Sequence, residues 1–186
     1  DGAAVGNVFA SPSTRHVCEV ARAAHSGAGV LLGYGNYAGD VLNFEAAAQL
    51  LRQEGYDVTT VAVSDDVASA DGDDPATRRG VAGDLVVLKV AGAAAQEGRA
   101  LPDVTEVAQR ANSRTHTLGV AFSGCTLPGA DAPLFAVPPG AMGVGMGVHG
   151  EPGIGEDDLV PARELAARLV SALVATRPAG ADGRAA

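Results

Sequence analysis

Apolar runs of strand length alternate with segments of helical periodicity along most of the chain. Such alternation is typical of β-α-β units, so the predicted fold class is α/β, with a mostly parallel sheet and flanking helices. The pattern predicts helices at about 11–24, 40–54, 81–96, 102–112 and 159–175, and strands at 29–35, 57–63, 117–123 and 134–137.

Two segments need a choice between structures. Residues 81–96 combine valines and leucines that favour a strand with alanines that favour a helix, and their length favours the helix. Residues 64–77 carry five aspartates with Gly72 and Pro75, which predicts a solvated loop. A metal site built from those acids is an alternative for the loop. The five are Asp65, Asp66, Asp71, Asp73 and Asp74.

Composition narrows the possible functions. The 186 residues are 47% apolar, enough for a core, and the net charge of −9 with a single lysine, Lys89, argues against a nucleic-acid partner. No apolar run reaches the roughly 20 residues that span a bilayer, and no signal peptide is visible. We therefore expect a soluble, cytoplasmic protein with one domain over 1–175 and a flexible tail over 176–186.

The segment Gly33–Asp40 follows a predicted strand and places Asp40 at the start of a predicted helix. Open α/β sheets bind ligands at this position, beyond the carboxyl ends of their strands. Asp40 can also serve as a simple helix cap, accepting a hydrogen bond from the free N–H groups of the first turn. The two roles are compatible, and the sequence leaves both open.

The segment Gly143–Gly153 has glycines at alternate positions, which allow the backbone to approach a small ligand closely. His149 is expected to project from the end of a strand within it. An imidazole nitrogen at such a place is a candidate nucleophile or base.

Several chemistries lack their usual residues. Lys89 lies within a predicted helix, so a Schiff base with a carbonyl substrate has no obvious amine. The chain has no Gly-Lys pair of a phosphate-binding loop, and its glycine run lacks the spacing of a dinucleotide fingerprint. A generic α/β hydrolase is disfavoured because there is no Gly-x-Ser-x-Gly elbow.

Five stretches together resemble the substrate-binding subunit of the dihydroxyacetone kinases. They occur in the family's order and extend over nearly the whole chain to about residue 175. The stretch around His149 is the most specific. The stretches are Val8–Ser13, Asn36–Phe44, Arg78–Gly83, Gly119–Ala121 with Cys125–Pro128, and Gly145–Gly153.

The resemblance implies a role for each candidate residue. His149 would add to the ketone carbon of a short ketose to form a covalent hemiaminal, and Asp40 would help to remove the proton of the terminal hydroxyl during phosphoryl transfer. Ser11, Gly39 and Gly147 would line the substrate. The resemblance further implies a homodimer, no metal on this chain, and ATP with Mg²⁺ held by a separate all-helical domain or subunit.

The chain departs from the family pattern in three places. Gly35 stands where the family usually has a lysine, and the usual N-terminal glycine-rich loop with a second histidine and the closing strand are missing, which suggests a domain truncated at both ends. The Tyr34–Asp40 stretch resembles a branch that acts on erythrulose, so the substrate is dihydroxyacetone or erythrulose. A non-catalytic ketose sensor remains the alternative function.

Overall fold

The computed structural model describes residues 1–69 and 74–176, and it divides the chain into two compact units. The first unit comprises Asp1–Asp66 and Ala70–Thr115, and the second comprises Val67–Ser69 and His116–Ala186. None of the helices in the described ranges is long and apolar enough to cross a bilayer. The predicted division into a domain of 1–175 and a tail stays a prediction, and 177–186 lie outside the described residues.

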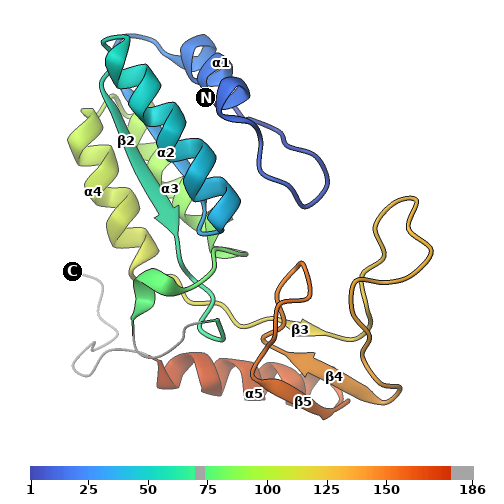
Figure 1. The fold of residues 1–186 in the computed structure, drawn as a ribbon. Coiled ribbons are helices and arrows are strands. Elements are labelled where there is room, and N and C mark those ends of the chain that lie inside the picture. Colours follow the sequence, from blue (N-terminus) through green and yellow to red (C-terminus); the bar gives the residue numbers. More distant parts are fainter. Residues whose placement is uncertain (70–73, 177–186) are drawn as a thin grey trace. The chain divides into compact units, whose positions relative to one another are not determined.

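The first unit is a two-stranded parallel sheet between two pairs of helices (Figure 1). The strands run in parallel register from Val30 opposite Val58 to Gly35 opposite Val63. The predicted strand-helix-strand unit is thereby confirmed. In chain order the elements are α1 (Thr14–Ala24), β1 (Val30–Gly35), α2 (Ala38–Gln53), β2 (Val58–Val63), the 3-10 turn η1 (Pro75–Thr77), α3 (Gly83–Gln96) and α4 (Leu101–Asn112).

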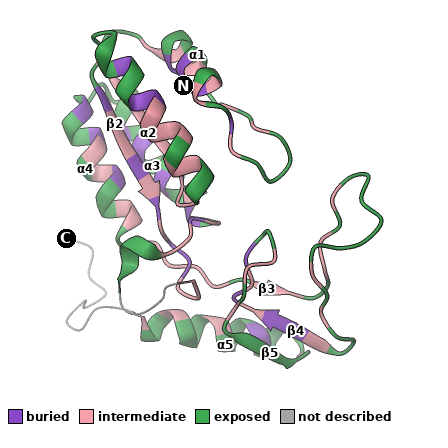
Figure 2. Ribbon diagram, in the orientation of Figure 1, coloured by how far each residue is buried: buried purple, intermediate pink, exposed green. Residues whose placement is uncertain are grey.

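Each face of this sheet has its own apolar core, because successive side chains of a strand point to opposite faces. On one face Leu32 packs with α1 and α2 around the fully buried Leu51, and on the other Val61 and Val63 pack with α3 and α4. Figure 2 shows these buried positions along the inner sides of the helices. The helix predicted at 81–96 is confirmed, since α3 buries Val87 against the sheet.

The start of α3 corrects the solvated loop predicted for 64–77. Asp65 is fully buried and accepts hydrogen bonds from the backbone N–H groups of Val81 (2.9 Å) and Gly83 (2.8 Å). Asp66 is 4% exposed and forms an ion pair with Arg79 at 2.8 Å. Both acids are internal because the N–H groups at the start of α3 and the partly buried Arg79 need partners.

The metal site considered for that loop has no support from its described residues. Asp74 accepts a hydrogen bond from Ala76 at η1, and Asp71 and Asp73 lie outside the described residues. Within 1–69 and 74–176, no group of three or more histidine, cysteine or acidic residues is placed to hold a metal ion.

The second unit contains a three-stranded antiparallel sheet of order β3-β4-β5. These strands depart from the mostly parallel sheet predicted from the sequence, because no helix lies in the connections 122–140 and 145–154 to form the crossover that parallel neighbours usually need. The sheet consists of β3 (Val120–Ala121), β4 (Ala141–Val144) and β5 (Gly155–Asp158), and α5 (Ala162–Ala175) follows it.

Two predicted strands differ in this unit. The strand at 117–123 is reduced to β3, and the strand at 134–137 is irregular. Prolines bracket the second segment at Pro133 and Pro138, and a proline has no N–H to donate to a neighbouring strand. The final helix begins at Ala162 instead of 159 because Pro161 occupies its N-cap.

Candidate functional site

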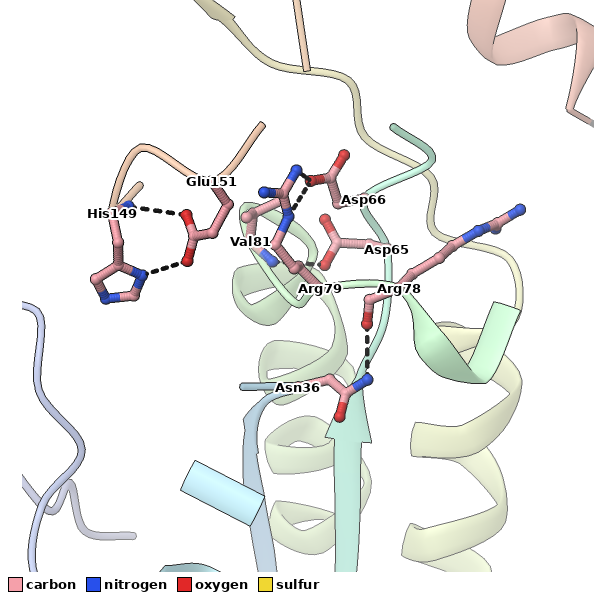
Figure 3. Close-up of polar contacts among 8 residues, drawn as sticks. All are labelled: Asn36, Asp65, Asp66, Arg78, Arg79, Val81, His149 and Glu151. Carbon is pink, nitrogen blue, oxygen red and sulfur yellow. Dashed lines mark hydrogen bonds and ion pairs between the residues drawn. The ribbon is translucent and has the colours of Figure 1, made fainter. Parts of the chain in front are cut away.

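In the first unit, the candidate site lies at the carboxyl ends of β1 and β2. The loop that leaves β1 is held by Asn36, whose side-chain amide donates to the carbonyl oxygens of Arg78 (2.7 Å) and Ala76 (2.9 Å), the first of which is drawn in Figure 3. The backbone N–H of Asn36 donates to Val63 at the end of β2. The Asn-Tyr stretch thus ties the ends of both strands to the segment before α3.

Asp40 lies in the first turn of α2 and is partly buried. Asp40 does not occupy the N-cap position, the role that the sequence left open beside a chemical one, because Tyr37 holds that position. A carboxylate in the first turn is still favoured by the free N–H groups at the start of a helix. Its oxygens are therefore not committed to a cap, which is compatible with a chemical role.

Ser11 and Gly39 meet beside Asp40. A Cβ atom added at Gly39 would lie 3.5 Å from the Cβ of Ser11, which is ordinary contact distance. The Ser11 hydroxyl donates weakly to the carbonyl of Pro12 at 3.3 Å. The structure therefore brings together the three residues that the sequence assigned to this half of the site.

A second carboxyl group in this unit was not identified from the sequence. Asp84, in the first turn of α3, has a buried Oδ1 atom with no hydrogen-bond partner among the described residues. Its Oδ2 would lie 3.1 Å from a Cβ added at Gly35. Desolvation, followed by the charges of Asp65 and Asp40, raises the pKa of Asp84 from 3.8 to about 6. The only sequence signal was an acidic residue just after the Arg78–Gly83 stretch.

Asp84→Asn is expected to stabilise the protein at pH 7 to 8 and to leave it unchanged near pH 3.5. The carboxyl ionises near pH 3.8 in the unfolded protein and near pH 6 in the folded protein. The charged carboxylate therefore destabilises the folded protein increasingly between these pH values and fully above them. The gain is on the order of 1–3 kcal/mol, discounted for partial exposure. Urea unfolding at both pH values measures it.

The exposed Asp103, in the first turn of α4, provides the matched control. Asp103→Asn should show no gain at pH 7 to 8. Between pH 4 and 6.5, the free energy of unfolding of the wild type should fall relative to that of Asp84→Asn. If it does not fall, Asp84 does not lie in the desolvated, acidic environment described above.

In the second unit, His149 lies in the turn between β4 and β5 instead of at a strand end. Gly150 donates its N–H to the carbonyl of Gly147 at 3.0 Å, and Gly147 donates to the carbonyl of Glu151 at 3.0 Å. Gly150 has a φ angle of +86°, which favours glycine. The turn thus uses both backbone groups of Gly147 and presents the side chain of His149, which is 37% exposed.

Glu151 holds the imidazole of His149, a role that was not predicted from the sequence. Its Oε1 lies 2.7 Å from Nδ1 of the ring, and its Oε2 accepts the backbone N–H of His149 at 3.0 Å (Figure 3). A local signal for this pair exists in the sequence, because a carboxylate two residues after a histidine can bond both the ring and the backbone N–H of that histidine.

The charge of Glu151 determines the tautomer of His149. Partial burial would raise the pKa of Glu151, but hydrogen bonds from its own backbone N–H and from the ring and backbone of His149 outweigh burial and lower it. An ionised carboxylate only accepts hydrogen bonds, so Nδ1 carries the proton. In the neutral ring the lone pair then resides on Nε2, which is the nucleophilic nitrogen.

The predicted site residues are thus divided between the units. Ser11, Gly39 and Asp40 belong to the first unit, and Gly147 and His149 belong to the second.

The sequence of this chain matches the family model of the Dak1 domain over residues 1–185. The chain belongs to the Dak1 domain family. It is 57% identical over 184 residues to a D-erythrulose kinase of Mycolicibacterium smegmatis, covering 99% of this chain and 32% of that protein. It is 44% identical over 174 residues to a dihydroxyacetone-binding subunit DhaK of Listeria innocua, covering 94% of this chain and 52% of that protein.

Solved structures agree with this assignment. The dihydroxyacetone kinase of C. freundii, also solved in complex with AMP-PNP and Mg²⁺, superposes with a TM-score of 0.82 at 41% identity, covering 91% of this chain and 31% of that one. The dihydroxyacetone kinase operon co-activator Dha-DhaQ superposes with a TM-score of 0.81 at 28% identity, covering 90% of this chain and 51% of that one. The α/β fold class and the resemblance of the sequence to this family are confirmed.

Proposed function

We propose that the chain is the substrate-binding part of a short-chain ketose kinase and that His149 captures the ketose covalently. The observation that carries the proposal is the 2.7 Å bond between Nδ1 of His149 and Glu151, which leaves the lone pair on Nε2. The names of the relatives, erythrulose kinase and dihydroxyacetone-binding subunit, support the substrate class. The chain spans about a third of the first of these relatives, so the activity of the whole protein is part of the proposal.

Capture requires no oxidant and no loss of water. The lone pair of Nε2 attacks the carbonyl carbon, the C–O π bond breaks, and the resulting alkoxide takes up a proton to become a hydroxyl. The alkoxide takes this proton from solvent, and the ring loses its Nδ1 proton through Glu151 to solvent, so the proton count balances. A hemiaminal therefore adds the full mass of one ketose, whereas a Schiff base would add that mass minus water.

Glu151→Gln is expected to weaken ketose capture by about 10- to 100-fold, as is typical when the partner that orients a functional histidine is lost. An amide can donate to Nδ1 and thereby place the proton on Nε2, which removes the nucleophilic lone pair. Ketose affinity measured by calorimetry on the full-length protein tests this result.

Glu156→Gln is the matched control, because Glu156 is an exposed acid on β5. It should leave the affinity unchanged. Equal affinities of wild type and Glu151→Gln across the pH range would show that Glu151 does not set the tautomer.

Asp40 is proposed to assist phosphoryl transfer. Its carboxylate would accept the proton of the terminal hydroxyl as that oxygen attacks the phosphoryl group, with Ser11 and Gly39 beside it. ATP and Mg²⁺ are assigned to a separate all-helical domain or subunit, where they supply the phosphoryl group and neutralise its charge. The cytoplasmic location and the homodimer stay predictions.

A ketose sensor without catalytic activity is the second candidate function. The likeness to a kinase operon co-activator favours it. The carboxylate of Asp40 favours the kinase, because sensing requires capture but not removal of a proton.

One experiment separates the two functions. The full-length protein is supplied with ketose, ATP, Mg²⁺ and the nucleotide-binding domain or subunit, and ketose phosphate is measured. A kinase forms ketose phosphate. Capture of ketose without any phosphate product would identify a sensor and overturn the kinase proposal.

A further inference from the structure

Gly35 and Asp84 create an unusual local environment at the carboxyl end of β1. Gly35 has no side chain, and the position of its missing Cβ lies 3.1 Å from both Oδ2 of Asp84 and the carbonyl oxygen of Gly80. The carboxylate of Asp84 and the carbonyl of Gly80 therefore pack closely against the bare backbone of Gly35, and a side chain at this position would have to push them aside.

The other oxygen of this carboxylate, Oδ1, is buried and has no hydrogen-bond partner among the described residues. A buried acceptor without a donor costs free energy, and a water, an ion or a ligand group that supplies a partner removes this cost. The neighbouring Asp65 differs, since the N–H groups of Val81 and Gly83 satisfy it.

One of the two arginines that precede α3 already has an acidic partner. Arg79 pairs with Asp66 at 2.8 Å. The charges that act on Asp84 come from two acids, Asp65 and Asp40, and both raise its pKa. Among the described residues no cation offsets the effect of these acids on the pKa of Asp84, and a donor from a ligand would relieve the cost.

We propose that Asp84 is a specificity-determining residue that accepts a hydrogen bond from the additional hydroxyl of a four-carbon ketose, beside the bare backbone of Gly35. The inference rests on the proposed function. Erythrulose differs from dihydroxyacetone by one CHOH group, which brings one further hydroxyl donor. Asp40 and Asp84 lie in the first turns of α2 and α3, within electrostatic reach of each other, so the two carboxyls can serve one small polyol.

Selectivity follows from the unpaired oxygen. A site that hydrogen-bonds a substrate hydroxyl discriminates strongly against the analogue that lacks it, because the buried group then stays without a partner. The greater identity to a D-erythrulose kinase (57%) than to a dihydroxyacetone-binding subunit (44%) agrees with a preference for erythrulose.

The test measures kcat/KM of the full-length kinase for erythrulose and for dihydroxyacetone. The wild type is expected to prefer erythrulose, and Asp84→Ala is expected to lower the ratio of the two efficiencies by at least about 10-fold. Gly35→Ala places a methyl group against the carboxylate and should lower the same ratio. Gly92→Ala in α3, where an added Cβ meets nothing within 4 Å, is the control and should leave the ratio unchanged.

The outcomes distinguish this inference from the proposed function. A wild type that captures and phosphorylates dihydroxyacetone but not erythrulose, or an Asp84→Ala variant that loses both efficiencies equally or neither, overturns the role of Asp84 and leaves the kinase intact. A wild type that neither captures nor phosphorylates any ketose overturns the proposed function itself. Thermal melting of each variant identifies losses that come from unfolding.

Discussion

Asp40→Asn is expected to slow phosphorylation of the ketose by about 10²- to 10⁴-fold, the usual contribution of a positioned general base. The amide keeps the size of the side chain but cannot accept the hydroxyl proton. Capture of the carbonyl should persist, because His149 lies on another part of the chain and does not depend on this carboxylate. The expected signature is therefore a loss in kcat with ketose binding retained, measured by coupled assay and calorimetry.

Asp103→Asn, a matched change in the first turn of α4, should retain full activity. A near wild-type kcat of Asp40→Asn would show that Asp40 takes no part in the reaction. Its role would then be limited to the favourable charge at the start of α2.

His149→Ala is expected to reduce kcat/KM for the ketose by about 10²-fold or more, since the covalent bond that positions the substrate is lost. The same change should abolish discrimination between ketose and glycerol, because only a carbonyl compound can form the adduct. Relative rates with the two substrates provide the measurement. His16→Ala, at a partly exposed position of α1, is the control and should not alter the ratio.

The first unit was largely predictable from local signals. Glycine ends α2 at Gly55, where φ is +91°, and Ser13 accepts the N–H of His16 to begin α1. These capping signals act within a few residues, so the strand-helix-strand unit could be read from the chain. The burial of Asp65 could not be predicted, because its hydrogen-bond partners lie 16 and 18 residues further along the chain and only the fold brings them near.

The second unit was harder to predict because its strands are short. β3 has two residues and β4 has four, so periodicity gives little information about their bounds or direction. His149 was found because its glycine-rich surroundings and family resemblance are specific. Glu151 was within reach of the same reasoning but was passed over, and Asp84 depends on a contact with Gly35 that no local pattern reveals.

The central claim is that Nε2 of His149 forms a reversible covalent bond with the ketose. The most direct measurement is the intact mass of the full-length protein incubated with the ketose, for wild type and His149→Ala. We expect the wild type to gain one ketose with no loss of water, and the variant to gain nothing. An increment that survives in His149→Ala, or one that corresponds to an imine, would contradict the account.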